Sequence, residues 1–174
     1  MARGLVLLFT GDGKGKTTAA LGTALRAWGH GMRVLFLQFV KGERVMTGER
    51  LAASRLGEGF TLETLGAGFI FGWEEEEKHR EAARRAWERA KEAVNSGKYD
   101  LVVLDEFTYV LRYGFVTIAE VEGMIRSRPA GVHLIFTGRG APKELVDLAD
   151  TVTEMREVKH HYHQGISAQK GIEY

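Results

Sequence analysis

The sequence predicts a single α/β domain over residues 1–174, in which helices cover both faces of a mainly parallel sheet as three layers. Three observations lead to this fold class. Short apolar runs alternate with amphipathic helical patterns, a glycine-rich turn joins the first apolar run to the first helix, and no repeat or linker divides the chain. The 174 residues are 44% hydrophobic and 27% charged, which is ordinary for one folded core. We therefore expect ligands at the carboxyl ends of the strands.

Continuous apolar runs are typical of strands buried inside a parallel sheet. Such runs predict strands at residues 5–10, 33–39, 60–65, 101–104, 132–137 and 151–154. The first run could also belong to a signal peptide, but it is short, and a glycine-rich loop follows it without a small-residue cleavage pattern. No run approaches the length of a transmembrane helix. We therefore expect a cytoplasmic protein with no membrane partner.

Apolar residues at helical spacing predict helices at 17–29, 48–56, 74–96, 118–127 and 142–149. The helix at 74–96 has the clearest pattern, because glutamates at its start complement the helix dipole and Gly97 follows its end. These glutamates could instead bind a metal, but their place at a helix start explains them more simply. Residues 66–73 are rich in glycine and aromatic side chains and are expected to form a loop.

The composition excludes several kinds of site. The chain has no cysteine, so disulfides, thiolate nucleophiles and cysteine-bound metals are excluded. Its 24 basic and 23 acidic residues give a net charge of +1, and so small a charge does not favour nucleic acid as a partner.

The turn after the first predicted strand matches most of the phosphate-loop pattern G-x-x-x-x-G-K-[ST]. In that pattern backbone N–H groups surround phosphate oxygens, the lysine reaches the terminal phosphates and the hydroxyl binds magnesium. Gly15, Lys16 and Thr17 supply its end, while Thr10 stands where the first glycine belongs. The strand and helix around the loop favour ATP over a merely flexible turn, and the glycine spacing does not fit a dinucleotide fingerprint. The predicted nucleotide-binding residues of the loop are Thr10, Gly11, Asp12, Gly13, Lys14, Gly15, Lys16, Thr17 and Thr18.

Two adjacent acids, Asp105 and Glu106, close the apolar run at 101–104. An acid at the end of a neighbouring strand holds Mg²⁺ in P-loop proteins, and we therefore predict a RecA-like P-loop NTPase fold. A buried aspartate with structural hydrogen bonds is the alternative interpretation of Asp105. The predicted metal ligands are Thr17, Asp105 and Glu106. They indicate a nucleotide and magnesium but do not say which bond of ATP breaks.

Eight segments along nearly the whole chain have a recognisable pattern, and they are residues 10–18, 29–31, 38–42, 102–109, 137–140, 148–154, 158–160 and 165–174. Together and in this order they resemble the P-loop ATP:corrinoid adenosyltransferases. A P-loop alone is shared by many enzymes. Its combination with the strand end Leu104-Asp105-Glu106-Phe107-Thr108-Tyr109 and with this tail is specific to the family. Thr10 in place of the first glycine is then a family trait.

The resemblance implies transfer of the 5′-deoxyadenosyl group of ATP to the cobalt(I) of a reduced corrinoid, in adenosylcobalamin synthesis or salvage. Triphosphate leaves intact, and ATP lies reversed relative to its orientation in kinases. Cobalt(I) is itself a strong nucleophile, so no protein base is needed and none is evident. Lys16, Thr17 and Glu106 are the predicted catalytic residues, because with Mg²⁺ they stabilise charge on the departing triphosphate. The family also implies a homodimer and a flavoprotein reductant.

Corrinoid-binding residues are expected in the loop that matches the family motif Gly-Phe-Thr-Trp, whose aromatic side chains displace the lower axial ligand. Phe69 matches directly, and either Phe71 or Trp73 is the second aromatic. The alternative is that these residues belong to the core. His160, in the tail, is a further corrinoid candidate. Arg139, after a predicted strand end, is either a nucleotide contact or a plain surface arginine.

Several points stay open. Asp12 is often asparagine in the family, and a carboxylate there would repel phosphates unless it points outward or toward magnesium. His160, His161 and His163 could suggest a metal site, but the absence of cysteine and of a helical i, i+4 pair favours a solvated or substrate-lining loop. The P-loop alone also fits a small-molecule kinase, an ATP hydrolase or a nucleotide-dependent binding module. The sequence indicates neither the physiological corrinoid nor the identity of the reductant.

Overall fold

A computed structural model describes residues 3–42, 46–68 and 76–174, and the strands in this part of the chain form one sheet. They are β1 (Val6–Thr10), β2 (Val34–Gly42), β3 (Phe60–Gly66), β4 (Leu101–Asp105), β5 (His133–Thr137) and β6 (Thr151–Glu154). Their order is β3-β2-β4-β5-β1-β6, and each neighbouring pair is parallel. The parallel sheet predicted from the apolar runs is confirmed.

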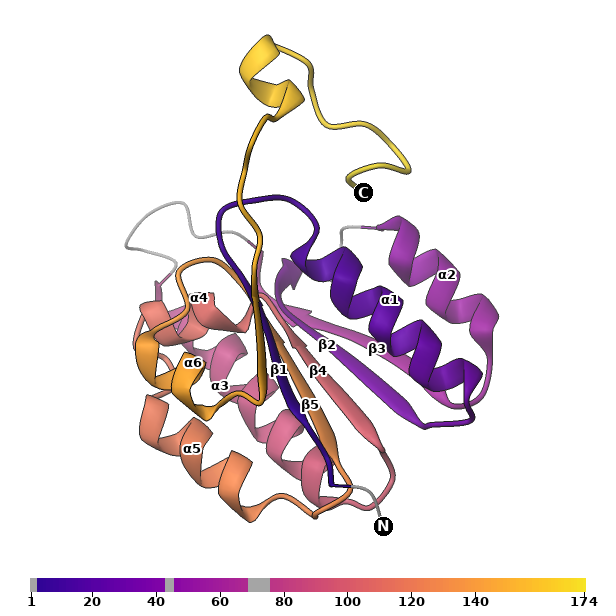
Figure 1. Cartoon of the computed structure of the whole chain (residues 1–174), viewed down its shortest axis with the longest axis vertical. Coiled ribbons are helices and arrows are strands. Elements are labelled where there is room, and N and C mark those ends of the chain that lie inside the picture. Colours follow the sequence, from indigo (N-terminus) through magenta and orange to yellow (C-terminus); the bar gives the residue numbers. More distant parts are fainter. Residues whose placement is uncertain (1–2, 43–45, 69–75) are drawn as a thin grey trace.

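Helices cover both faces of this sheet (Figure 1). One face carries α1 (Lys16–Gly29) and α2 (Gly48–Leu56). The other carries α3 (Glu76–Asn95), α4 (Phe107–Arg112), α5 (Ile118–Ser127) and α6 (Lys143–Leu148). The three layers of the predicted α/β fold are therefore present, as in P-loop NTPases.

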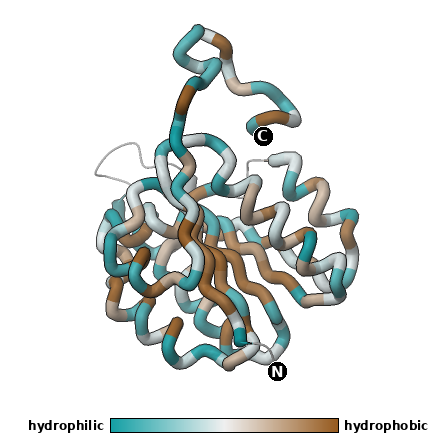
Figure 2. Tube along the Cα trace, in the orientation of Figure 1, coloured by the Kyte–Doolittle hydropathy of each residue, from teal (hydrophilic) through white to brown (hydrophobic). Residues whose placement is uncertain are grey.

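Alternate residues of each strand face opposite layers. In β2, Leu35 and Leu37 pack in the core that includes α3, while Val34 and Phe36 pack with α1 and α2. All four side chains are fully buried. Figure 2 shows the resulting band of hydrophobic strands through the middle of the molecule. Because both faces are covered, the central strands carry mostly apolar side chains, and their sequences show runs rather than alternation.

The long helix predicted at 74–96 is present as α3, with the bounds Glu76–Asn95. Apolar residues at helical spacing form its buried face, and they include Ala83, Ala86, Trp87, Ala90 and Val94. The Trp87 ring lies with its centroid 5.5 Å from that of Phe107, so α3 and α4 meet over the sheet. Residues 69–75, which include the predicted aromatic loop, lie outside the described residues.

Two short helical segments were not predicted. Helix α4 has the sequence Phe-Thr-Tyr-Val-Leu-Arg, whose residues mostly favour strands, and six residues are too few to show a helical period. The 3₁₀ helix η2 (His161–Gln164) is shorter still. Strand β2 also continues past residue 39 to Gly42, because pairing with β3 resumes at Gly66 after a bulge. In the described ranges, no helix is both long and apolar enough to cross a membrane.

The carboxyl ends of β1, β5 and β4 lie side by side in the sheet, with β5 in the middle. Thr10, Thr137 and Asp105 are the last residues of these three strands. Ligands of open parallel sheets bind at this edge. The glycine-rich loop between β1 and α1 leaves the sheet at the same edge (Figure 1).

Candidate functional site

The loop at residues 11–15 is shaped by glycines that no other residue could replace without strain. Gly11 and Gly15 have φ angles of 93° and 110°, in the region that favours glycine. A Cβ on Gly11 would lie 2.4 Å from the carbonyl oxygen of Met155. Thr10, by contrast, is a regular strand residue, and its Oγ1 accepts a hydrogen bond from the Ala141 amide at 3.2 Å. This explains why the first glycine of the usual pattern is not needed here.

The segment that follows β6 packs directly on this loop. The Gly13 amide donates to the Met155 carbonyl at 2.7 Å. A Cβ on Gly13 would lie 2.7 Å from the same carbonyl oxygen, so the close approach depends on glycine. The loop is therefore held between α1 and the C-terminal segment, a contact that its sequence pattern does not reveal.

Lys16 opens α1 and folds back over the loop. Its Nζ donates to the carbonyl oxygens of Gly11 and Gly13 at 2.7 and 2.6 Å. Burial lowers the pKa of Lys16, and the nearby Arg139 guanidinium lowers it further, while Asp12 and the acids after β4 oppose this. The amine is thus a partly desolvated donor that the loop itself positions.

Thr17, Asp105 and Thr137 form one hydrogen-bonded group beneath the loop. The hydroxyls of Thr17 and Thr137 both donate to Asp105 Oδ1, at 2.8 and 2.7 Å. Asp105 is fully buried, and its second oxygen, Oδ2, has no hydrogen-bond partner among the described residues. Burial raises the pKa of Asp105, and the two threonine hydroxyls counteract this by stabilising the carboxylate. A buried acid oxygen beside a hydroxyl and a phosphate loop is suited to a hard cation.

Glu106 lies next to this group in an unusual backbone conformation. Its φ is 59°, a positive value that no other non-glycine residue in the described ranges has. Its amide donates to Thr137 Oγ1 at 2.8 Å, which ties the strained turn to β5. Burial raises the pKa of Glu106, and the neighbouring charge of Asp105 raises it further. Backbone strain of this kind gathers at functional sites.

A pocket of about 450 Å³ lies beside Lys16 and Glu106. The turn after β5 forms part of its wall: Thr108 Oγ1 donates to the Arg139 carbonyl at 2.8 Å, and a Cβ on Gly138 would lie 2.0 Å from Thr108 Oγ1. Glycine therefore lets the turn pack against α4 and brings Arg139 to the pocket. The lining residues are Lys16, Val40, Glu106, Thr108, Tyr109, Arg112, Gly138 and Arg139.

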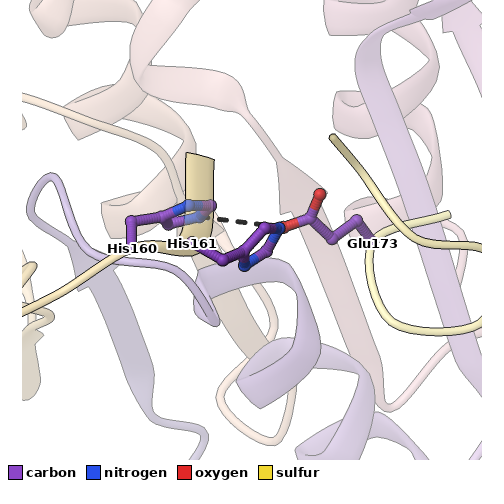
Figure 3. Close-up of side chains that lie close together, drawn as sticks. All are labelled: His160, His161 and Glu173. Atoms are coloured by element: carbon purple, nitrogen blue, oxygen red, sulfur yellow. Dashed lines mark ion pairs between the residues drawn. The ribbon is translucent and has the colours of Figure 1, made fainter. Parts of the chain in front are cut away.

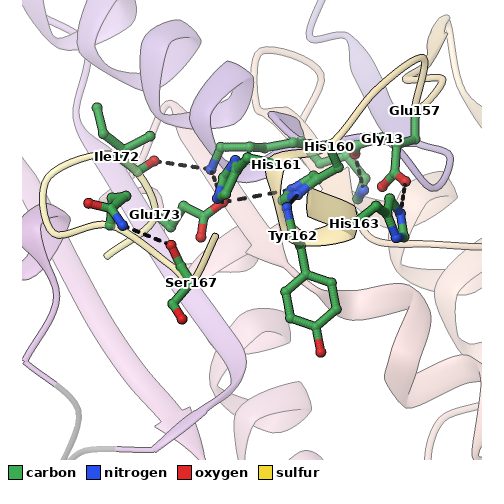
Figure 4. Close-up of polar contacts among 12 residues, drawn as sticks. Gly13, Glu157, His160, His161, Tyr162, His163, Ser167, Ile172 and Glu173 are labelled. Carbon is green, nitrogen blue, oxygen red and sulfur yellow. Dashed lines mark hydrogen bonds and ion pairs between the residues drawn. The ribbon is translucent and has the colours of Figure 1, made fainter. Parts of the chain in front are cut away.

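A second pocket, of about 780 Å³, lies between the loop and the C-terminal segment. Asp12 is exposed on the loop and lines it, as do Arg139 and His160. The segment then returns over the loop, where Lys14 Nζ donates to the Ile172 carbonyl at 3.0 Å (Figure 4). The last residues of the chain thus belong to the surroundings of the phosphate loop.

The structure brings together five of the predicted site residues from distant parts of the sequence, and these are Lys16, Thr17, Asp105, Glu106 and Arg139. Thr18 is exposed on the first turn of α1. Phe69, Phe71 and Trp73 lie outside the described residues. Thr137, which links both acids, was not singled out, although its place at a strand end beside the Gly-Arg turn was a usable signal. Tyr109 and Arg112 also line the pocket, and both belong to helix α4, which was not predicted.

Comparison with known proteins gives one consistent family. A family model described as ATP:corrinoid adenosyltransferase BtuR/CobO/CobP matches residues 2–174. A corrinoid adenosyltransferase of Escherichia coli (strain K12) is 42% identical over 172 residues, which cover 99% of this chain and 86% of that protein. The corrinoid adenosyltransferase CobA of Salmonella typhimurium has the same identity and coverage. One from Pseudomonas aeruginosa is 41% identical over 174 residues, 99% of this chain and 84% of the relative.

Proposed function

Because the chain belongs to the ATP:corrinoid adenosyltransferase family, we propose that the site at the ends of β1, β4 and β5 binds ATP for transfer to a reduced corrinoid. The enzyme is a transferase. The 5′-deoxyadenosyl group of ATP is transferred to cobalt, and inorganic triphosphate leaves. The observation that carries the assignment to this site is the direct hydrogen bond between Thr17 of the phosphate loop and the buried Asp105 of β4.

The leaving group sets what the phosphate loop must do. When the bond between the 5′-carbon and its oxygen breaks, negative charge gathers on the triphosphate, and donors fixed in advance stabilise that charge without reorganising. Lys16 Nζ, which donates to the carbonyl oxygens of Gly11 and Gly13, would donate to phosphate oxygens instead when ATP binds. The N-terminus of α1 presents its free amides at the same place.

The oxygen donors beneath the loop fit a magnesium ion. Asp105 Oδ2 is buried and has no hydrogen-bond partner in the part of the chain that the structure describes, and the Thr17 hydroxyl lies on the same carboxylate. Thr17, Asp105 and Glu106 would hold Mg²⁺, directly or through water, as hard oxygen ligands. When bound, the ion would neutralise charge on the triphosphate.

Cobalt(I) is the nucleophile of this reaction and belongs to the substrate, so the protein supplies position rather than a base. The pocket beside Lys16, with Tyr109 and Arg112 of α4, and the larger pocket under the C-terminal segment both leave room for a partner beside the phosphate loop. Phe69, Phe71, Trp73 and His160 stay the proposed corrinoid contacts on the strength of the family resemblance. A homodimer, a flavoprotein reductant and a cytoplasmic location stay predictions as well.

The test is optical. The protein, ATP, Mg²⁺ and chemically reduced cobalamin are mixed without oxygen, and we expect an adenosylated product whose absorbance spectrum reverts on exposure to light. Thr61→Ala, an exposed change in β3 away from the proposed site, serves as a control for Thr17→Ala. The proposal fails if the wild-type protein leaves the corrinoid spectrum unchanged while it consumes ATP, since that result fits a kinase or an ATP hydrolase.

A further inference from the structure

The C-terminal segment brings three metal-binding side chains to one point. His160 and His161 stand at the start of the 3₁₀ helix η2, and Glu173 reaches them from the far end of the tail (Figure 3). One ligand atom of each residue lies within 4.8 Å of the other two. The spacing of the histidines alone did not support a metal site, and the carboxylate of Glu173 is the ligand that only the fold supplies.

The distances are close to those of a bound ion. Glu173 Oε1 lies 3.3 Å from His161 Nε2 and 3.7 Å from His160 Nε2. Ligand atoms about 2.0–2.1 Å from a tetrahedral zinc ion lie about 3.3 Å apart. The two distances from Glu173 therefore differ from this value by less than half an ångström. The ligand atoms of the two histidines lie within 4.8 Å of each other.

The state of His161 also points to a ligand. Its Nε2 is buried yet makes no hydrogen bond within the described residues, because the contact with Glu173 lacks hydrogen-bond alignment. A buried polar nitrogen without a partner is costly unless something else satisfies it. His160 differs, since its Nδ1 accepts from the Tyr162 amide at 3.2 Å. Ligation through Nε2 places the ring proton on Nδ1, so this long contact is given up when an ion binds.

We propose that His160, His161 and Glu173 form a binding site for a divalent transition-metal ion of the zinc type. Two imidazoles and one carboxylate suit zinc, whereas Mg²⁺ prefers oxygen ligands alone. The three side chains are between 17% and 29% exposed, so an ion can enter and water can complete its coordination. The site is separate from the oxygen donors at Asp105, and it assigns His160 to the metal ion instead of to the corrinoid.

A bound ion would fasten the tail over the phosphate loop. Glu173 lies 3.6 Å from Lys14 Nζ, and the neighbouring Ile172 carbonyl accepts from the same amine. Joining η2 to residue 173 closes the tail into a loop that rests on Lys14. Lys14 repels a cation, but its side chain is 43% exposed and can turn away from Glu173 toward water.

The experiment is a calorimetric titration of the untagged protein with Zn²⁺, carried out in excess Mg²⁺. We expect one equivalent to bind, and His161→Ala and Glu173→Gln each to weaken binding by about 100-fold or more. His163→Ala is the matched control, because His163 lies in the same 3₁₀ helix but pairs with Glu157 at 2.7 Å. Its affinity for Zn²⁺ should equal that of the wild type.

A second readout reports on the tail itself. Zn²⁺ should slow tryptic cleavage after Lys170, an exposed residue between the proposed ligands, in the wild type but not in Glu173→Gln. Circular dichroism confirms that the variants are folded. The site is refuted if no Zn²⁺ binds to the folded wild type. It is also refuted if His161→Ala keeps full affinity, or if His163→Ala loses as much as His161→Ala. None of these results bears on corrinoid adenosylation, which is measured separately.

Discussion

Replacing Thr137 by valine removes one hydroxyl group and largely keeps the shape of the side chain. That hydroxyl is fully buried at the end of β5, where it donates to Asp105 Oδ1 at 2.7 Å and accepts from the Glu106 amide at 2.8 Å. The change therefore leaves an amide without its acceptor and a buried carboxylate with one donor fewer. It touches both predicted metal-binding acids without altering either.

The expected loss follows from these two contacts. An unsatisfied buried group costs about 1–3 kcal/mol, and a hydrogen bond to a charged group contributes about 1.5–3 kcal/mol. Because one hydroxyl serves both contacts and Asp105 can take up a proton instead, we expect the free energy of unfolding to fall by about 3 kcal/mol. For a chain of this size that lowers Tm by about 6–12 °C. The loss of a donor also raises the pKa of Asp105 further, so half-maximal activity should need more Mg²⁺.

Urea unfolding and a Mg²⁺ titration of activity measure both effects. Thr137→Ser is the control, because it keeps the hydroxyl and removes one methyl group, which costs about 1 kcal/mol. Equal stability of Thr137→Val and the wild type would refute the reasoning. So would a loss in Thr137→Ser as large as that in Thr137→Val, since packing rather than hydrogen bonding would then explain both.

Burial raises the pKa values of Asp105 and Glu106, so the metal-free folded protein holds these protons to higher pH than the unfolded chain does. The free energy of unfolding of the metal-free protein should therefore fall as pH rises from about 4 through the raised pKa values, and Mg²⁺ should offset this fall. Urea unfolding at several pH values, with EDTA or with Mg²⁺, measures the effect. Equal stabilities in EDTA and in Mg²⁺ would contradict the prediction. Lys16→Ala should lower kcat by about 100-fold or more, the effect of one lost transition-state donor, with unchanged circular dichroism; an unchanged kcat argues against its role. Gly138→Ala places a Cβ 2.0 Å from a hydroxyl oxygen of α4 at a φ of 143°, and calorimetry should show a stability loss of about 2 kcal/mol. Gly123→Ala in α5, where a Cβ meets nothing within 4 Å, should be neutral or stabilising.

Much of the fold could be predicted because the central strands β1, β2, β4 and β5 are buried on both faces and so appear as apolar runs. Lys16, Thr17 and Asp105 could be predicted as parts of one site, since the pattern places them at a helix start and at a strand end. What the pattern does not contain is the pairing across β5. The hydroxyl of Thr137 contacts both Asp105 and Glu106 because β5 lies next to β4, and that order is a property of the sheet.

The tail was the hardest part to predict. It has no apolar period, and its interactions join residues that are far apart in the sequence, such as Gly13 with Met155 and Lys14 with Ile172. Likewise His161 and Glu173 carry no local signal of their proximity. Helix α4 was missed for a different reason, because six residues of strand-favouring type form a helix only where Phe107 and Val110 are buried against the core.

Phosphorus NMR of the products tests the central claim most directly. Wild-type protein is incubated without oxygen with ATP, Mg²⁺ and reduced corrinoid, and the phosphorus spectrum is recorded as adenosylated corrinoid appears. We predict inorganic triphosphate in equal amount to the adenosylated product, with neither ADP nor free phosphate formed in step with it. ADP or orthophosphate as the phosphorus product, without transfer of carbon to cobalt, would contradict the account.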